Sequence, residues 1–416
     1  MSDVGEHIVT DTAEDEVAAA ALERSKFGVT AEVVALYAIC LFVALALAAI
    51  CVAATGGSWT NVYTAIIDGS IRKPGRWGLT LGVSAPILLV ALGTIVNGRA
   101  GLVNIGQESQ LVMGSGFAAY LGVRLGGPGP FVLVIAMLFG AVGGALWAGI
   151  AGVLRYYRNV PEVLTTLLLG TVAANLIGWG LRKPSLLLAP AAGRANRNQV
   201  SEPLAHNTRI PRVTWFGNEF PISVLLAVAL AAVVWLVIDR SIIGFRLRML
   251  GRNPKTARRS GVAERRYGIG AMLVSGGFAG LAGGVMLAGG DFGNYQLVAN
   301  FGAGIGFAGL LAALVARQRV IVAVFVAFLF GCMRTGSGFL RATGVSARIA
   351  DVVQGLLVLA MLLPPAILYV RARRRAQGSE PWATSSPRSG TLLPTRVRTA
   401  TPSSPRSCCC SAPPEN

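Results

Sequence analysis

Charged residues are scarce in this sequence, at 13% of its 416 residues, whereas hydrophobic residues make up 53%. Several apolar runs of roughly twenty residues are almost free of charge, and each is long enough to cross a bilayer as a helix. The alternation of apolar and polar residues that marks a membrane β-barrel is missing. We therefore predict an all-α, polytopic membrane protein and not a water-soluble domain.

The motifs of several enzyme classes are also missing. No Gly-Lys-Ser or Gly-Lys-Thr ending of a P-loop is found in the chain, so any ATP that drives this protein must be hydrolysed by another chain. The two histidines, His7 and His206, lie in polar segments and form no zinc motif. No G-x-S-x-G nucleophile elbow is present either. These absences argue against an intramembrane enzyme.

Cysteine is rare, with six residues in the chain. Cys40, Cys51 and Cys332 fall within apolar runs, where cysteine usually packs as a small apolar residue. The other three, residues 408–410, lie in a low-complexity segment. No spacing fits a metal site, and no disulfide framework is implied.

The most informative feature that is present is a basic segment, residues 240–266, between two apolar runs. From Asp239 to Tyr267 the chain carries nine arginine and lysine residues against two acids. By the positive-inside rule this bias places the segment on the cytoplasmic side. The placement of basic residues on the cytoplasmic side also accounts for the net charge of +18. No aromatic-and-basic module indicates nucleic-acid binding.

Hydropathy divides the chain into a polar leader (1–30), a transmembrane domain (31–370) and a tail (371–416). The tail is rich in Ser, Pro, Thr and Arg, and we expect it to be disordered. About ten spans are expected in the domain, with both termini in the cytoplasm. The spans cover approximately residues 31–54, 78–96, 111–122, 131–154, 162–181, 222–238, 269–287, 301–315, 320–332 and 350–370.

The two halves of the domain resemble each other. Each contains a helix, a Gly-rich polar break and a short Gly-rich helix, written GLVNIGQESQLVMGSGFAAYLG from Gly101 and AGGDFGNYQLVANFGAGIGFAGLLAAL from Ala288. Five spans per half would place the halves in opposite orientation, as in inverted-repeat transporters whose solute site lies near the membrane midplane. Two Gly-rich hairpins of similar composition would give the same appearance.

Polar side chains gather in both breaks, at Asn104, Gln107, Glu108 and Gln110 in the first and at Asn294, Tyr295, Gln296 and Asn300 in the second. Polar and ionisable groups are costly in lipid and usually face a bundle interior or an aqueous cavity. Carboxylate and carboxamide groups offer donors and acceptors for the hydroxyl and ring-nitrogen groups of a polar solute. We therefore predict a solute pathway. The alternative is a buried hydrogen-bond network that ties the helices together.

Two further positions admit more than one role. Tyr295 is suited to stacking on a ring of the solute, but also to anchoring the chain at a membrane interface. Glu162 follows Pro161 at the start of an apolar run, where a helix N-terminus and its capping are the simplest interpretation.

Three stretches of the chain resemble the permeases of ABC importers in the branched-chain amino acid and simple-sugar group: GRAGLVNIGQESQ at 98–110, VPEVLTTLLLG at 160–170 and GFRLRMLGRNPKTARRSGV at 244–262. The first is similar to the Asn-Ile-Gly-x-Glu-Gly-Gln signature of the nucleoside-type members, with Ser109 in place of the second glycine. The second is similar to their Asn-Glu-Val-Ile-x-Thr segment, with Val160-Pro161-Glu162 in place of the Asn-Glu pair. The resemblance covers about residues 78–370.

The resemblance implies uptake of a nucleoside or related sugar-containing solute across the bacterial cytoplasmic membrane by alternating access. It also implies three partners: a cytoplasmic ABC ATPase, an extracytoplasmic solute-binding receptor or lipoprotein, and a second permease subunit, either a paralogue or a copy of this chain. The ATPase would bind ATP and magnesium, so no cofactor is expected in this chain. A simple sugar or a branched-chain amino acid is the alternative cargo. An ion- or proton-coupled transporter, with Glu108 carrying the proton, is the alternative mechanism.

The same resemblance makes the basic segment the site of ATPase coupling. The residues concerned are Gly251, Arg252, Asn253, Pro254, Ala257, Arg258, Arg259 and Gly261. Asn253-Pro254 is a helix-start signal and Gly261 is a stop signal, which predicts a short helix over KTARRSG. A short rigid helix is suited to transmitting a push from the ATPase.

Overall fold

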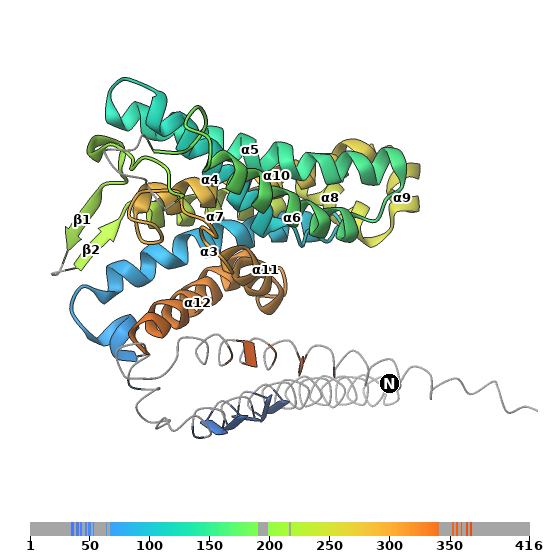
Figure 1. The fold of residues 1–416 in the computed structure, drawn as a ribbon. Helices are drawn as coiled ribbons and strands as arrows, with labels where there is room; N and C mark the ends of the chain where they lie inside the picture. Colours follow the sequence, from blue (N-terminus) through green and yellow to red (C-terminus); the bar gives the residue numbers. More distant parts are fainter. Residues whose placement is uncertain are drawn as a thin grey trace, which may run out of the picture. The chain divides into compact units, whose positions relative to one another are not determined.

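The computed structural model describes residues 67–340, apart from 190–198 and 216–217, together with scattered positions between 35 and 64 and between 352 and 367. The leader, the tail and most of the first and last expected spans lie outside the described residues. In the described part the fold is helical, as predicted (Figure 1). The total of ten spans stays a prediction.

The eight expected spans that fall in the described part are all helices. Five of these helices are long and apolar enough to cross a membrane: α3 (Arg76–Arg99), α5 (Gly129–Arg158), α6 (Glu162–Gly180), α7 (Ser223–Arg240) and α10 (Glu264–Gly289). The other three are α4 (Gln107–Arg124), α11 (Ile305–Val315) and α12 (Val320–Leu340).

Helix α3 lies in the core of the bundle. Residues 82–97 of this helix are all buried, as expected for a helix that is apolar on every side. Helix α10 packs against α3, α4 and α5, and glycines permit its close approach. A Cβ atom added to Gly144 of α5 would lie 2.3 Å from the carbonyl oxygen of Gly276 in α10. Small residues at such crossings let helices associate in lipid, where no hydrophobic force drives them together.

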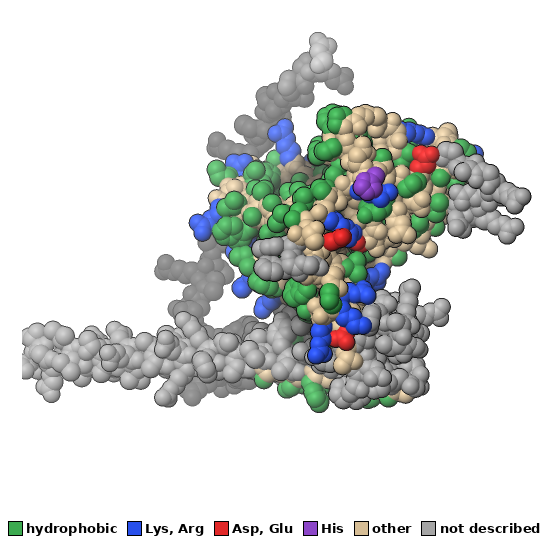
Figure 2. All heavy atoms as spheres, turned by 90° about the vertical axis from the view of Figure 1, so that its left-hand side faces the viewer, with side chains coloured by type: hydrophobic (Ala, Val, Ile, Leu, Met, Phe, Trp, Pro, Cys, Tyr) green, Lys and Arg blue, Asp and Glu red, His purple; other side chains and the backbone are tan. Residues whose placement is uncertain are grey.

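The two ends of the bundle differ in character. At the end that we call the basic end, α7 leads into α8 (Ile242–Arg252) and α9 (Pro254–Arg259), after which α10 returns. At the opposite end, the hairpin end, strands β1 (Arg212–Trp215) and β2 (Asn218–Pro221) pair antiparallel. Figure 1 shows α8 and α9 far from the strands, and Figure 2 looks onto the hairpin end, where acidic and basic side chains lie close together.

Short elements complete the connections in the described part. A π-helix, η1 (Asp68–Arg72), precedes α3, and a 3-10 helix, η2 (His206–Thr208), precedes β1. The hairpin spans the end of the hydrophilic connection 182–219 and the two residues after it, and no strands were predicted there. Each strand has only four residues, too few for an alternating pattern to be recognised.

Two helix boundaries also differ from the prediction. Helix α4 begins at Gln107, four residues before the expected start, because its polar first turn is accommodated inside the bundle. Helix α11 begins at Ile305, four residues after the expected start, because Asn300, Gly302 and Gly304 all have positive φ angles and form turns.

Candidate solute pathway and coupling site

The first polar break, residues 100–106 between α3 and α4, is held by a network of buried amides. The Asn104 side chain donates to Gln110 Oε1 at 2.9 Å and accepts from Gln110 Nε2 at 3.0 Å. Asn104 also donates to the Ser275 hydroxyl of α10 at 3.0 Å. Both carboxamides are at most 2% exposed. A fully bonded network of this kind fixes the path of the chain at the break.

Gln107 extends this network to α3. Its terminal amide lies 2.7 Å from the Thr94 hydroxyl and 3.2 Å from the Ser275 hydroxyl. The network therefore ties α3, α4 and α10 together, which is the alternative role considered for these carboxamides. A role of Asn104, Gln107 and Gln110 in the solute pathway stays a prediction. Because their side chains bond to one another and to neighbouring helices, such a role would be indirect, through the positions of these helices.

Glu108 points to a different neighbour, the N-terminus of α11. Its carboxylate accepts hydrogen bonds from the backbone N–H groups of Gly304 at 2.7 Å, Gly306 at 2.7 Å and Phe307 at 3.3 Å. A carboxylate at this position satisfies the free N–H groups of the helix start and complements its dipole. The two segments that resembled each other in sequence are thus in direct contact through Glu108.

A cavity of about 350 Å³ opens beside this contact, between α4, α6 and residues 298–307. Its polar lining residues are Glu108, Ser109, Thr166, Thr171 and Asn300, and its aromatic ones are Phe301 and Phe307. Of the predicted pathway residues, Glu108 and Asn300 line the cavity. The hydroxyl and aromatic residues of the lining were not predicted as site residues, since no signal in the sequence indicated that α6 lies beside the break.

The break approaches α6 closely at Gly106. A Cβ atom at this position would lie 2.8 Å from the carbonyl oxygen of Thr166. Ser109, which stands where the resembled signature has glycine, donates its hydroxyl to the Gly106 carbonyl at 2.6 Å. The serine is therefore accommodated without displacing the backbone of the break.

The second polar break contains Asn294, Tyr295 and Gln296, which are not among the residues that line this cavity. Asn294 and Tyr295 have positive φ angles, so they shape a turn. The ring of Tyr295 lies under the guanidinium of Arg209, 4.0 Å from the ring centroid. This contact places Tyr295 among the loops of the hairpin end. Its two predicted roles, stacking on the solute and anchoring the chain at a membrane interface, stay predictions.

An ion pair at the hairpin end fixes the start of this second break. Arg212 of β1 lies 2.6 Å from the Asp291 carboxylate and donates to the Gly289 carbonyl at 2.9 Å. Burial alone lowers the pKa of the Arg212 guanidinium, but the adjacent Asp291 carboxylate raises that pKa above its ordinary value. Burial likewise raises the pKa of the Asp291 carboxyl, although the Arg212 guanidinium opposes this shift. The pair joins the hairpin to the end of α10.

Glu162 makes an ion pair instead of an N-terminal cap. Helix α6 begins at this residue as predicted, but no side chain caps it. The Glu162 carboxylate lies 2.8 Å from Arg155 of α5 and accepts a long hydrogen bond of 3.5 Å from the Val103 N–H. Glu162 thus connects the α5–α6 turn to the first break.

The short helix predicted in the basic segment is confirmed as α9. Its N-cap, Asn253, accepts hydrogen bonds from the N–H groups of Lys255 at 3.1 Å and Thr256 at 3.2 Å, and Pro254 occupies the first turn. Gly261, with a φ angle of 79°, follows its end. Its buried residue is Ala257.

The basic residues predicted for coupling lie on or beside this helix. Arg252 and Arg259 are exposed, whereas Arg258 makes an ion pair of 2.8 Å with Glu264 at the start of α10. The geometry of α9 therefore offers a rigid, positively charged helix at the surface of the basic end. Its role in coupling stays a prediction.

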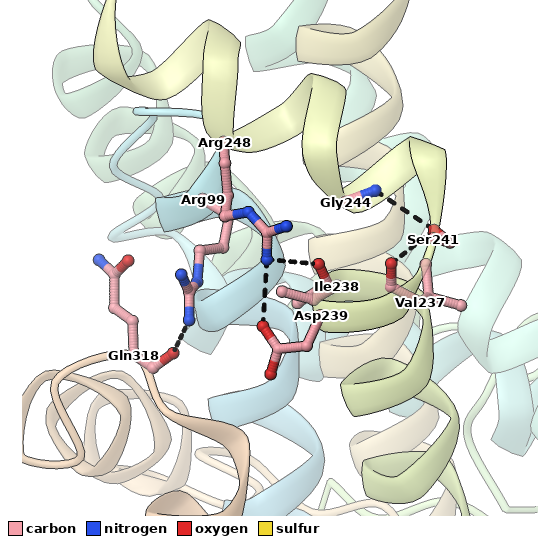
Figure 3. A network of polar contacts seen from close by, with 8 residues as sticks. All are labelled: Arg99, Val237, Ile238, Asp239, Ser241, Gly244, Arg248 and Gln318. Atoms are coloured by element: carbon pink, nitrogen blue, oxygen red, sulfur yellow. Dashed lines mark hydrogen bonds and ion pairs between the residues drawn. The ribbon is translucent and has the colours of Figure 1, made fainter.

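Helix α8 is clamped to the end of α7 (Figure 3). Arg248 donates to the Ile238 carbonyl at 2.8 Å and makes an ion pair of 3.2 Å with Asp239. The Ser241 hydroxyl donates to the Val237 carbonyl and accepts from the Gly244 N–H at 3.3 Å. These bonds make the α7–α8 corner a rigid joint.

The last turn of α8 touches the first polar break directly. A Cβ atom at Gly251 would lie 2.4 Å from the Arg99 carbonyl oxygen, and a Cβ atom at Gly101 would lie 2.9 Å from the Gly251 Cα atom. Arg99 in turn donates to the Gln318 carbonyl at 3.0 Å, in the turn between α11 and α12 (Figure 3). The basic segment is thereby packed against the first polar break, and the end of α3 is bonded to the α11–α12 turn.

In the part of the chain that the structure describes, His, Cys, Asp and Glu side chains form no group of three that could hold a metal ion.

The chain is similar to known proteins over most of its length. Residues 78–362 match the model of a family described as branched-chain amino acid transport system, permease component. The chain is similar to the guanosine ABC transporter permease protein NupP of Bacillus subtilis, with 27% identity over 82% of this chain and 96% of that protein.

Two further relatives are of the same kind. The glucose ABC transporter permease protein TsgB13 of Haloferax volcanii is 28% identical over 69% of this chain and 76% of its own length. The guanosine ABC transporter permease protein NupQ of Bacillus subtilis is 27% identical over 70% of this chain and 89% of its own length. The polar breaks and the basic segment all lie within the matched residues.

Proposed function

The chain belongs to the family of branched-chain amino acid transport system permease components, and from this membership we propose its solute and its partners. It is the permease subunit of an ATP-driven importer, a transport component and not itself an enzyme. We propose that it translocates a nucleoside or a closely related sugar-containing solute. The observation that carries this proposal is the mixed polar and aromatic lining of the cavity beside Glu108.

The lining suits the two chemical parts of a nucleoside. Hydroxyl, carboxylate and amide groups, at Thr166, Thr171, Glu108 and Asn300, are suited to the hydroxyls of a ribose. Phe307, whose side chain is partly exposed, offers a ring on which a base can stack. The volume of about 350 Å³ falls in the range of small-molecule sites. Branched-chain amino acids need a partner for an ammonium and a carboxylate together, and the lining has no basic residue.

The named functions of the relatives support the same solute class. NupP and NupQ are guanosine permeases, whereas TsgB13 is a glucose permease. All three of these names refer to solutes that are sugars or contain one. The shared part, a ring with several hydroxyls, is what the polar lining of the cavity accommodates.

We propose that a cytoplasmic ATPase, which binds ATP and magnesium, docks on α8 and α9 at the basic end. A solute-binding receptor or lipoprotein would dock at the hairpin end, and a second permease subunit would complete the pathway. In this cycle, movement of α8 shifts the first break through the contact of Gly251 with Gly101. The break carries Glu108, so the movement reaches the start of α11 and the cavity.

Competition for uptake tests the solute class. The permease is reconstituted into proteoliposomes with its ATPase and receptor, and ATP-dependent uptake of labelled guanosine is measured. Unlabelled adenosine and uridine are expected to compete, whereas leucine is not. Competition by leucine alone would overturn the proposal. Competition by glucose, with no effect of any nucleoside, would overturn the nucleoside assignment in favour of a simple sugar.

A further inference from the structure

A second cavity lies at the basic end, between α7, α8 and α10, and has a volume of about 350 Å³. Apart from two residues its lining is apolar or glycine: Val96, Val233, Val234, Val237, Ile238, Ile243, Leu247, Gly270, Ala271, Val274 and Phe278. Val233 and Val274 are about half exposed, at 51% and 45%, so in the described part the cavity opens to the outside of the bundle. A cavity with these walls is suited to a hydrocarbon chain.

The two polar residues of the lining, Arg266 and Tyr267, both lie where α10 begins. Arg246 of α8 donates to the Tyr267 hydroxyl at 2.7 Å, which brings a second guanidinium to the same place. Arg266 makes no hydrogen bond or ion pair with the residues that the structure describes. The cavity is therefore apolar along its length and positively charged at one end.

No acid in the basic segment neutralises this charge. Of its two acids, Asp239 is paired with Arg248 at 3.2 Å and Glu264 is paired with Arg258 at 2.8 Å. Nine basic residues against two acids leave an excess of seven positive charges between residues 239 and 267. An anion is the complementary ligand.

We propose that this cavity binds an anionic phospholipid, with an acyl chain between α7 and α10 and the phosphate at Arg266 and Arg246. Guanidinium groups bind phosphate through paired N–H donors. Basic pockets between membrane helices on the cytoplasmic side are suited to anionic headgroups. A soluble anion would make no use of the hydrocarbon walls, and a neutral lipid would make no use of the free guanidinium.

Photolabelling tests the proposal. The purified full-length permease is placed in phosphatidylcholine vesicles that contain a small fraction of phosphatidylglycerol with a photoreactive acyl chain, and labelled peptides are mapped by mass spectrometry. We expect label on peptides of α7 and α10, and we expect excess unlabelled phosphatidylglycerol to displace it while excess phosphatidylcholine does not. Equal displacement by both lipids, or no label in these helices, would overturn the proposal.

Two substitutions test the binding of the acyl chain and of the lipid headgroup separately. A Cβ atom at Gly270 meets nothing within 4 Å, so Gly270→Leu fills the cavity without a backbone clash and should abolish the labelling. Gly126→Leu, at an equally open position between α4 and α5, is the control and should keep it. Arg266→Gln should lower the labelling about fivefold, as expected when one basic residue is removed from an anionic lipid surface.

Another possible occupant is a segment of the chain itself. Cross-links from cysteines at positions 233 and 274 to residues 35–53 or 352–367 would show that a segment of this protein fills the cavity, and would refute lipid binding. Unchanged labelling in Gly270→Leu would refute it as well. The melting temperature of each variant establishes that it is folded.

Discussion

Glu108 is the residue through which the two polar breaks are joined. Its carboxylate accepts hydrogen bonds from three backbone N–H groups at the start of α11, while its own backbone belongs to the first turn of α4. Hydrogen bonds to an ionised group are stronger than those between neutral groups. A displacement of α4 at this turn therefore acts on α11 directly.

Glu108→Gln is predicted to reduce uptake while leaving the permease assembled with its ATPase. A carboxamide keeps one acceptor oxygen, so its NH2 group faces either the Gly304 N–H or the N–H groups of Gly306 and Phe307. Loss of a hydrogen bond to a charged group is worth roughly 1.5–3 kcal/mol, so uptake should fall about tenfold or more. Uptake in proteoliposomes and co-purification of the ATPase are the measurements.

The matched control is Glu219→Gln, because the Glu219 side chain is 67% exposed at the hairpin end. Because the hairpin end is also the proposed receptor face, uptake is measured with saturating receptor, and this change should then leave it near the wild-type rate. If Glu108→Gln transports with unchanged kinetics, Glu108 has no part in the solute pathway.

The ion pair of Asp291 with Arg212 gives a prediction about stability. Asp291→Asn removes the charge that compensates a partly buried guanidinium, and an uncompensated polar group costs about 1–3 kcal/mol. We expect the melting temperature of the purified protein to fall. The double variant Asp291→Asn with Arg212→Gln should recover part of the loss. A melting temperature equal to that of the wild type in the single variant would contradict a stabilising role.

The sequence predicts which residues form the polar cluster but not how they divide between two faces of α4. Gln107 and Gln110 are three residues apart and lie on one side of α4, where Gln107 bonds to α3 and α10 and Gln110 bonds to the first break. Glu108 is rotated by about 100° from Gln107, toward α11. The side of α4 on which each residue lies depends on where the helix begins. The expected start at residue 111 left the whole cluster in a loop, and the division between network and cavity followed only from the folded helix.

At the scale of elements, α9 was predictable and α8 was not. Asn253, Pro254 and Gly261 are local signals that do not depend on the rest of the fold. Helix α8 has one such signal, the N-cap Ser241, and the density of basic residues between two apolar runs favoured a cytoplasmic loop. Its helical form depends on burying Leu247 and Leu250 against neighbouring helices, which is a tertiary effect.

Gly251→Ala is predicted to uncouple ATP hydrolysis from transport. The added Cβ atom would lie 2.4 Å from the Arg99 carbonyl, so α8 and the first break must separate. Overpacking of this kind costs about 1–3 kcal/mol, which corresponds to roughly tenfold in a rate. Uptake should fall by about this factor while the ATPase still binds and hydrolyses ATP.

Gly277→Ala is the control for this change, because its Cβ atom would meet its nearest neighbour at an ordinary 3.7 Å. Its uptake should stay close to that of the wild type. Equal ratios of uptake to ATP hydrolysis in Gly251→Ala and the wild type would refute the transmission of movement through this contact.

Charge at the surface of α9 gives another prediction. Arg259→Glu reverses an exposed charge at the basic end, and we expect the ATPase to co-purify less, with the largest difference from the wild type at low ionic strength, where charges are least screened. Arg72→Glu, at a residue whose side chain is 76% exposed near the start of α3, should have no effect on co-purification. Undiminished ATPase binding by Arg259→Glu would remove this residue from the docking surface.

At the scale of the whole molecule, the order of helices and breaks follows from hydropathy and glycine content. The contact between the two breaks does not, since Glu108 and Gly304 are 196 residues apart. The resemblance of the two segments made an inverted arrangement plausible. The structure brings the starts of α4 and α11 into direct contact, whereas the inverted orientation of the halves and the count of five spans per half stay predictions.

The energy source is a property of the assembly, and it separates an ATP-driven importer from a gradient-driven transporter. The chain has no P-loop, and a rigid charged helix, α9, stands at the basic end, where a separate motor can dock. We therefore expect no uptake when the purified permease alone is reconstituted and given a proton or sodium gradient. Adding the ATPase, the receptor and ATP with magnesium should start uptake, and vanadate should stop it. Uptake driven by a gradient without any ATPase would contradict the coupling of this fold to ATP, whatever solute it carries.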